Sequence, residues 1–506
     1  MAAVNERLDV MVIGFGPVGA VLADWLGQEG LSVAVVERST EVYPLPRAAH
    51  FDHEIMRVFQ RLGIVDAVLP HVRVAGAYEF RNAAGDLLMV ARRGGEQGVS
   101  GWDYSYMFNQ PAIERALRAQ IAQMPNVSVR LGHSFAGFDQ HCDGVTVHID
   151  DEGGERRHVE ARYLVGCDGA WSPVREALGI GLEDYKFDEP WLVVDTIPHD
   201  PLKLPTVNLQ ICDPARPTTC VLMGPGCHRW EFMLLPGEDA DVALADGFVE
   251  SLLAPWGFDL TIQRKAVYRF HGLIAQQWRA GNVLLAGDAA HQMPPFAGQG
   301  MCSGIRDAAN LAWKLVAVLK DGARPELLDT YQPERDRSVR DYIELAIEMG
   351  RVVCTLDAAV AAQRDARMIA KLATGAEAPP ALVGGPGRAG GLFMPDDPSA
   401  AVIFPQFVSA DGQRLDDVLG PAAWLIDHHG GPGSSRLRRI AVTDPVLAPF
   451  RTDLRTWLQQ SDADAVLVRP DRYVFGSGAP ADLLDAWNRA VTGGAPQDVV
   501  PEVQRA

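Results

Sequence analysis

The 506-residue sequence lacks the marks of a membrane, secreted or nucleic-acid-binding protein. No apolar run reaches the roughly 18 residues that a membrane-spanning helix needs. The N-terminal stretch MAAVNERLDVMVIGFG has no basic segment followed by an apolar one, so it does not resemble a secretory signal peptide. Positive charge is scarce, with 46 Lys and Arg against 65 Asp and Glu and a formal net charge of −19. This balance disfavours nucleic acid and membrane surfaces as partners, and we expect a cytoplasmic protein.

Cysteine is also sparse and forms no framework. The seven cysteines include no C-x-x-C pair, and their odd number suits reduced thiols in a reducing compartment. No cysteine follows Cys354, which excludes thiol redox chemistry in the C-terminal part. The stretch HFDHE lacks the H-E-x-x-H order of a zinc site, so no metal is expected. The composition, 47% hydrophobic and 22% charged, is typical of a globular chain, and the length predicts about two to four domains.

The N-terminal segment predicts a dinucleotide-binding unit. An apolar strand at residues 8–13 leads into GFGPVG, then a helix to about residue 29 and a second strand at 31–37. The glycines Gly14, Gly16 and Gly19 permit a tight turn and a close approach of backbone to a pyrophosphate at the helix N-terminus. Glu37, at the end of the second strand, is placed to accept hydrogen bonds from a ribose. This unit alone does not distinguish FAD from NAD(P).

Two later turns repeat the combination of glycine and acid. GCDGAWSPVR places Asp168 after a buried strand, and GDAAH places Asp288 after another. Each aspartate by itself could equally be a helix N-cap. Ligands of open α/β sheets gather at the carboxyl ends of strands, so three such turns in this order favour one shared site.

The rest of the chain divides by composition. Helices are expected over 53–62 and 111–124, and the runs at 127–132 and 145–150 are expected to pair as a hairpin through 133–144. Short strands separated by Pro and Gly, with little helix, predict a separate antiparallel sheet over 185–270. Residues 357–391, rich in Ala, Gly and Pro, indicate a connector that begins as a helix and ends in APPALVGGPGRAGG.

A stiff loop rich in Pro and Gly, GDAAHQMPPFAGQG, precedes a long helical stretch. Steps of three and four predict a single apolar stripe that packs on the domain core, formed by Met301, Ile305, Ala308, Ala312, Leu315 and Leu319. The N-terminus of such a helix carries about half a positive charge and free N–H groups, which suit an anion.

The order of these motifs, with WLVVDTIPHDPL, HRWEFMLLPGE and LLAGDAAHQMPPFAGQG, resembles the class A FAD-dependent aromatic hydroxylases, a family of flavoprotein monooxygenases. This resemblance covers about residues 7–350, and within the family the quoted stretches look most like those of 3-(3-hydroxyphenyl)propionate hydroxylases. The resemblance implies an α/β fold: a Rossmann-like FAD-binding domain, an inserted antiparallel β-sheet substrate domain and a C-terminal thioredoxin-like domain. The implied boundaries are 1–184 with 271–356 for FAD, 185–270 with part of 75–108 for substrate, 357–391 for the connector, and 392–506 for a thioredoxin-like domain without redox cysteines.

The resemblance also implies which residues bind FAD. Its motifs match Gly14, Gly16, Pro17, Gly19, Glu37, Arg38, Arg47, Gln110, Asp168, Gly287, Asp288, Pro295, Gly298, Gly300 and Met301. Glu37 would bind the adenosine ribose, Arg47 the flavin side, and Gln110 and Asp288 the ribityl chain. Only one Rossmann fingerprint is present, so NADH or NADPH is expected to bind transiently as the reductant.

The implied reaction is the hydroxylation of a phenolic ring by O2 through a flavin C4a-hydroperoxide. A phenolic acid of the 3-(3-hydroxyphenyl)propionate type is the expected substrate; a polyketide, an antibiotic or a simple phenol is the alternative, and a non-catalytic FAD-binding protein is the alternative of another class. His50, His53 and Pro295 are the catalytic candidates. Arg229, Phe232 and Pro294 are the candidates for substrate contact. A homodimer is the oligomeric state that we consider for this protein.

Overall fold

The structure, a computed structural model, describes residues 7–92, 95–200, 204–257, 259–375 and 390–492. Its contacts define two compact units, 1–98 with 102–308 and 339–384, and 99–101 with 309–338 and 385–506. Residues 309–338, which we expected in the FAD-binding domain, therefore group with the C-terminal segment; the domain boundaries themselves stay a prediction. Within the described ranges no helix is both long and apolar enough to span a bilayer.

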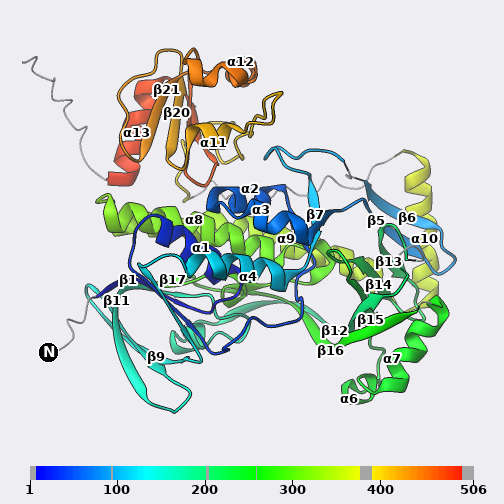
Figure 1. The fold of residues 1–506 in the computed structure, drawn as a ribbon. Coiled ribbons are helices and arrows are strands. Elements are labelled where there is room, and N and C mark those ends of the chain that lie inside the picture. The colour runs from blue at the N-terminus through cyan, green and yellow to red at the C-terminus, as the bar shows by residue number, and fades with distance from the viewer. Residues whose placement is uncertain (1–6, 93–94, 201–203, 258, 376–389, 493–506) are drawn as a thin grey trace, which may run out of the picture. The chain divides into compact units, whose positions relative to one another are not determined.

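The first sheet contains the expected strand–helix–strand unit. Its core order is β17-β18-β11-β1-β2-β8, with parallel pairing from β18 through to β8. Four-residue runs of buried apolar side chains in β1 and β2 fit a parallel sheet that is covered on both faces. Helices α1 and α4 pack against each other beside it (Figure 1). The elements of this region are β1 (Leu8–Ile13), α1 (Pro17–Gln28), β2 (Val33–Glu37), α4 (Gln110–Ile121), β8 (Val127–Leu131), β11 (Arg156–Gly166), α5 (Pro173–Ala177), β17 (Arg279–Ala280) and β18 (Val283–Leu285).

The predicted hairpin between 127–132 and 145–150 is wrong. β8 pairs in parallel with β2, whereas β10 (Gly144–Asp150) pairs with β9 (Ser134–His141) and with β11. β9 is mostly exposed and shows no clean alternation of buried and exposed residues, so its sequence gives a weak strand signal.

The second sheet has the order β19-β16-β12-β15-β14-β13-β5-β6. It is antiparallel apart from the parallel pair β13–β5, and its last two strands, β5 and β6, come from residues 77–92. Helices α6 and α7, which the sequence analysis did not predict, lie beside its strands (Figure 1). The elements are β5 (Ala77–Asn82), β6 (Leu87–Arg92), β12 (Leu182–Pro198), β13 (Asn208–Cys212), β14 (Thr218–Leu222), β15 (His228–Met233), α6 (Ala240–Ala243), α7 (Asp246–Leu253), β16 (Leu260–Ala275) and β19 (His291–Gln292).

A small third sheet and several helices complete this unit. The sheet joins β3 (His50–Asp52), β7 (Ser105–Phe108) and β4 (Val72–Val74). Helix α2 (His53–Leu62) matches its predicted bounds and is followed by α3 (Val65–Val68). The connector begins with α10 (Ala358–Ala373), as expected, and most of APPALVGGPGRAGG lies outside the described residues.

The second unit contains a four-stranded sheet of order β21-β20-β22-β23. The first two strands are parallel and the others antiparallel, the arrangement expected of a thioredoxin-like domain. A core of large side chains that includes Phe404, Trp424 and Phe450 fills it. Its elements are α11 (Leu415–Leu419), β20 (Ala423–Asp427), β21 (Leu437–Ala441), α12 (Arg451–Gln460), β22 (Ala465–Val468), β23 (Val474–Gly478) and α13 (Pro480–Thr492), together with parts of α8 (Gly300–Lys320) and α9 (Tyr331–Val353).

Candidate active site

Three turns meet at the carboxyl edge of the first sheet. β1, β11 and β18 are neighbouring parallel strands, with Ile13 opposite Gly166 and Gly166 opposite Leu285. The turn after β1 touches the turn after β11, because a Cβ atom on Gly14 would lie 2.3 Å from the carbonyl oxygen of Cys167. A Cβ atom on Gly287 would lie 3.0 Å from a methyl group of Val18, at the start of α1. The structure thus brings the three glycine–acid turns together.

The first turn leaves the N-terminus of α1 open. Gly16 is the N-cap, so no side chain caps the first amide groups of the helix, and the first turn contains no acid. A Cβ atom at Gly16 would have no described atom within 4 Å, whereas one at Gly19 would lie 2.1 Å from the carbonyl oxygen of Gly14. Gly19 is therefore needed for packing, and the open space at Gly16 suits a pyrophosphate on the positive end of the helix.

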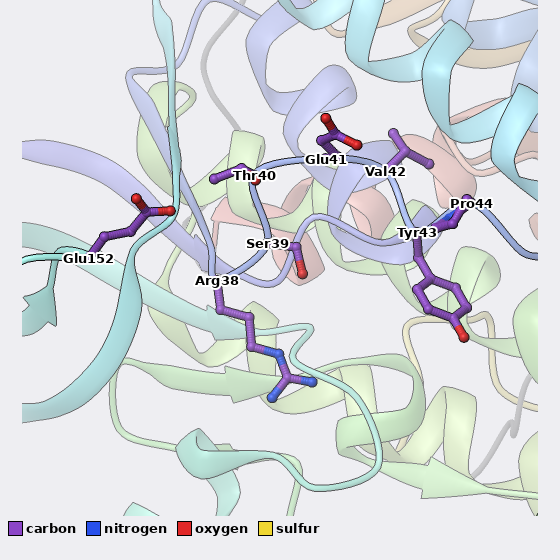
Figure 2. Close-up of a pocket in the computed structure, with 8 residues that line it drawn as sticks. All are labelled: Arg38, Ser39, Thr40, Glu41, Val42, Tyr43, Pro44 and Glu152. Atoms are coloured by element: carbon purple, nitrogen blue, oxygen red, sulfur yellow. The ribbon is translucent and has the colours of Figure 1, made fainter.

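Glu37 lies beside this turn and next to a pocket. Its Oε2 accepts a hydrogen bond from the amide of Phe15 and its Oε1 one from the amide of Ser39, each at 2.9 Å. The pocket has a volume of about 360 Å³, and Figure 2 shows Glu152 across it from the loop that follows β2. It is lined by Arg38, Ser39, Thr40, Glu41, Val42, Tyr43, Pro44 and Glu152. Its position directly after Glu37 is the one expected for the adenosine end of FAD.

The two aspartates of the later turns both keep oxygen atoms available. Asp168 accepts a hydrogen bond from the amide of Val174 at 3.0 Å through Oδ2, while its buried Oδ1 has no partner in the described structure. Asp288 is exposed to solvent, and the hydrogen bonds of the described residues include none to its carboxylate. An exposed carboxylate at the edge where the three turns meet is suited to accept a hydrogen bond from a ligand hydroxyl group.

The backbone around Arg47 is fixed from two sides. Gln110 Oε1 accepts hydrogen bonds from the amides of Arg47 at 2.9 Å and Ala48 at 2.7 Å, and its Nε2 donates to Glu114. Arg229 donates to the carbonyl oxygen of Arg47 at 2.8 Å. In this structure Gln110, which we expected on the ribityl chain, holds the Arg47 loop.

The loop before α8 is also held by side chains from other elements. His291 Nε2 lies 2.6 Å from Asp307 Oδ2, which also accepts a hydrogen bond from the amide of Gly287. Tyr78 donates to the carbonyl oxygen of Phe296 at 3.2 Å. Phe296 is buried in the short 3-10 helix Pro295–Ala297 and packs against aromatic rings of the second sheet. Pro294 and Pro295 are therefore part of a loop with a defined position.

The two candidate histidines have buried environments. Burial lowers the pKa of both His50 and His53, which favours neutral imidazoles. His50 contacts Ser105 Oγ at 2.7 Å and the carbonyl oxygen of Gly298 at 3.1 Å, so both ring nitrogens are engaged. His53 packs against the ring of Tyr104, with centroids 5.0 Å apart. The structure thus places His50 as a support of the loop before α8, through Gly298, and His53 in a packed interior.

Sequence reasoning missed a buried ionic cluster at the start of α8. Arg306 forms ion pairs with Asp52 and, at 2.6 Å, with Glu54, and it donates to Gln299 Oε1 at 3.0 Å. The aspartate also caps α2 by accepting from the amides of Glu54 and Ile55. The cluster fixes Gln299, one residue before α8, relative to α2. No local pattern signals it, because the partners are about 250 residues apart in sequence.

The two substrate candidates on β15 lie on opposite faces of the sheet. Arg229 pairs with Asp195, and the two side chains form an ion pair at 2.7 Å. Phe232 belongs to the hydrophobic core that includes Val249 and Leu253 of α7. Because alternate residues of a strand point to opposite faces, Phe232 faces away from Arg229, so the two candidates do not share one face of the sheet, and substrate contact by either stays a prediction.

Glu231 is the residue on the Arg229 face that sequence reasoning missed. Its exposed fraction is 7%, and its carboxylate accepts no hydrogen bond from any described residue. Its nearest cationic atom is Arg229 Nη1, 3.9 Å away. Burial raises the pKa of Glu231 to about 7, against the charge of Arg229. The sequence signal for Glu231 was that it is the single acid within HRWEFM. Because successive residues of a strand point to opposite faces, Glu231 points away from Trp230 and Phe232.

Comparisons with known proteins agree with this geometry. The model of the FAD binding domain family matches residues 7–346. A probable NADH-specific resorcinol 4-hydroxylase of Rhodococcus jostii RHA1 is 40% identical over 95% of this chain and 94% of its own length. A 3-(3-hydroxy-phenyl)propionate/3-hydroxycinnamic acid hydroxylase of Mycobacterium sp. JLS is 39% identical over 93% and 89%. The crystal structure of the flavin-dependent monooxygenase PieE has the same fold, with a TM-score of 0.80 at 23% identity over 96% of this chain and 99% of PieE.

The fold and the three converging turns define an FAD-binding protein, and the chain belongs to the FAD binding domain family. Within it the protein is an FAD-dependent aromatic-ring monooxygenase that uses NAD(P)H and O2. The resemblance stated from the sequence and the α/β fold class are confirmed.

Removing the carboxylate of Asp288 is expected to weaken FAD retention without unfolding the protein. A hydrogen bond to a charged group contributes about 1.5–3 kcal/mol, so Asp288→Ala should lower FAD affinity by about 10- to 100-fold. The ratio of flavin to protein absorbance after gel filtration measures this, with the exposed Asp66→Ala as the control. Unchanged flavin content in Asp288→Ala would show that this aspartate does not bind FAD.

Proposed function

We propose that the protein hydroxylates a monocyclic phenol with a second substituent meta to the hydroxyl group, using NADH as reductant. Two relatives that align over most of the chain are described as hydroxylases of resorcinol and of 3-(3-hydroxy-phenyl)propionate. Both compounds are phenols with a second substituent meta to the hydroxyl group. NADH is favoured by the name of the first relative. The observation that carries the proposal is a buried carboxylate, Glu231, on the face of the second sheet that also carries Arg229 and Trp191, which we call the inner face; its ionic contact in the described structure is Arg229 at 3.9 Å.

The residues that would hold FAD are those of the three turns and the two loops around them. Gly16 and the N-terminus of α1 would face the pyrophosphate, Glu37 the ribose and Asp288 a ribityl hydroxyl. When bound, FAD accepts hydride from the nicotinamide and delivers one oxygen atom of O2 to the ring. The N-terminus of α8 would stabilise negative charge on the reduced ring system. The aromatic packing around Phe296 would keep water away from the reacting atoms.

A neutral substrate such as resorcinol is favoured over a phenolic acid. Arg229, which we expected to contact the substrate, is engaged by Asp195 and by the carbonyl oxygens of Pro46 and Arg47. A substrate carboxylate on this face would also meet Glu231, and two like charges in a buried site repel each other. The phenolic acid expected from the sequence is the second candidate, supported by the propionate-hydroxylase relatives.

We expect resorcinol to stimulate NADH oxidation more strongly than 3-(3-hydroxyphenyl)propionate, 3-hydroxycinnamate, phenol or 4-hydroxybenzoate. The measurement is NADH and NADPH consumption with each compound, together with product mass for the gain of one oxygen atom and a peroxide assay for uncoupled turnover. A larger response to the phenolic acids would overturn the preference for a neutral ring. A yellow preparation that responds to none of them would support the non-catalytic alternative.

A further inference from the structure

The inner face of the second sheet carries a row of polar side chains that ends at Glu231. Glu231 on β15 pairs with Thr219 on β14, which pairs with Gln210 on β13. Tyr78 on the next strand, β5, follows, and its hydroxyl group donates to the carbonyl oxygen of Phe296. The row therefore runs from the loop before α8 across the sheet to Glu231.

The other polar groups of this row satisfy one another. The Thr219 hydroxyl group donates to Gln210 Oε1 at 2.7 Å, and Gln210 Nε2 donates to the Tyr78 hydroxyl oxygen at 2.6 Å. The strand neighbour of Glu231, Arg229, donates instead to Asp195 and to the Arg47 loop. Glu231 is more than nine-tenths buried, and its one ion pair in the described structure, with Arg229 Nη1 at 3.9 Å, is longer than a hydrogen bond. Its oxygen atoms are not among the buried acceptors that lack a partner in the described structure, so they are open to a hydrogen bond from a ligand hydroxyl group.

Aromatic side chains lie on the same face of the sheet as Glu231. Two positions along β15 from Glu231, Met233 pairs with Trp191. The Trp191 ring lies 5.7 Å from that of Phe296 and 6.0 Å from that of Phe270. Trp191 and Phe296 are buried and Phe270 is partly exposed, so Phe270 is the ring of this group that a flat phenolic substrate would meet on the face of Glu231.

We propose that Glu231 binds the ring hydroxyl group of the substrate and removes its proton. This inference rests on the proposed function, because it needs a phenolic substrate. The O–H bond breaks, the proton moves to a Glu231 carboxylate oxygen, and the electron pair stays on the ring oxygen. Nothing is oxidised or reduced in this step. When the hydroxylated ring becomes aromatic again, the proton returns to the ring oxygen and the carboxylate is restored.

The environment of Glu231 suits this task. A phenol such as a tyrosine side chain has a pKa of about 10, and a base whose pKa lies near the working pH transfers protons most effectively. Burial raises the pKa of Glu231 to about 7. The charged and titratable groups that face it are Arg229 on its own strand, Asp195 on β12 and Tyr78 on β5. A phenolate ring is more electron-rich than a phenol ring, so deprotonation speeds the attack of the ring on the oxygen atom that it receives from O2.

The test compares Glu231→Gln with the wild type and with Glu79→Gln. Glu79 is a carboxylate of similar burial on β5 of the same sheet, but it is paired with Arg81 and alternates away from the face of Tyr78. General-base catalysis typically contributes 10²- to 10⁴-fold, so product formation from resorcinol by Glu231→Gln at pH 7 should fall by at least about 10²-fold. Glu79→Gln should retain wild-type product formation. Flavin content should be unchanged in both variants.

Two further readouts separate a base from a structural residue. Product formation by Glu231→Gln should recover as the pH approaches the pKa of the substrate itself, and with fluorinated resorcinols that ionise near neutral pH. The difference spectrum of resorcinol bound to the oxidised holoenzyme should show phenolate absorption with the wild type at pH 8 and only phenol with Glu231→Gln. If Glu231→Gln does not fold, Glu231→Asp replaces it and should show a smaller loss with the same recovery.

The outcomes distinguish this inference from the proposed function. A wild-type protein that hydroxylates no phenol refutes the proposed function, and the inference with it. An active wild type with an equally active Glu231→Gln refutes the inference alone. A loss of activity that neither high pH nor an acidic phenol restores also refutes it, because a structural defect would not follow ionisation of the substrate.

Discussion

Gly14→Ala is expected to yield a protein that folds poorly and retains no FAD. Gly14 has a φ of +100°, a conformation that residues with a Cβ atom rarely adopt. The added Cβ atom would lie 2.3 Å from the carbonyl oxygen of Cys167. Both atoms belong to turns fixed by parallel strands, so neither can move without separating β1 from β11. We expect a loss of at least about 3 kcal/mol of stability, the range of backbone strain combined with overpacking.

Two matched variants separate the clash from the loss of the cofactor. Gly85→Ala also places an alanine at positive φ, +87°, but in open space in the β5–β6 turn, and should cost about 1 kcal/mol without affecting FAD. Gly16→Ala meets no described atom within 4 Å, so it should fold normally and lose FAD because its methyl group takes the place of a phosphate oxygen. Thermal unfolding and flavin absorbance report the two effects. A Gly16→Ala protein with full flavin content would contradict the pyrophosphate assignment.

The parts that the sequence predicted well depend on local patterns. β1, α1 and β2 follow from buried apolar runs, Pro17 in the first helical turn and glycines at set spacing, all within about thirty residues. The bounds of α2 follow in the same way, since Asp52 caps its start and Gly63 ends it in the left-handed conformation. Local signals of this kind need no knowledge of what packs against them.

The errors arise where distant partners decide the outcome. α8 was expected to bury a single apolar stripe, yet residues 302–318 are buried on every side. Its polar residues Arg306, Asp307 and Lys314 look like a solvated face, but each is paired with a buried group from another segment. Hydrophobic periodicity does not anticipate this, because a buried charge is tolerated only where a partner is present.

The same reasoning explains what was missed in the site. Strand alternation within HRWEFM could separate Phe232 from Arg229, but it does not say which face is covered by helices until α6 and α7 are known. Glu231 becomes a candidate only when its lack of a donor is seen, and that depends on Thr219 being occupied by Gln210. The proposal for Glu231 therefore depends on burial and side-chain contacts, which a sequence does not display.

Glu334→Gln is expected to destabilise the second unit by about 3–5 kcal/mol, the cost of removing one partner from a buried ion pair. Glu334 is inaccessible to solvent; its Oε2 accepts from Arg469 at 2.7 Å, and its Oε1 lies 3.0 Å from Lys314 Nζ and accepts from the Leu392 amide. The glutamine keeps the size of the side chain and removes its charge, leaving the cations of Lys314 and Arg469 under-compensated. Tryptophan fluorescence during urea unfolding measures the change, and the exposed Glu326→Gln should stay within about 0.5 kcal/mol of the wild type.

The pH dependence of the free energy of unfolding provides a second test of this ion pair. The charges of Arg469 and Lys314 outweigh burial and lower the pKa of Glu334 from 4.5 to about 2. Since the folded state holds the ionised form more strongly than the unfolded state, this stabilisation is complete above pH 4.5 and is lost as the pH falls toward 2. Burial lowers the pKa of Lys314 to about 8, so its contribution to stability rises as the pH increases from about 8 toward 10.5. Glu334→Gln should therefore flatten the acid limb of the stability curve, and an acid limb as steep as that of the wild type would show that this carboxylate does not anchor the C-terminal sheet.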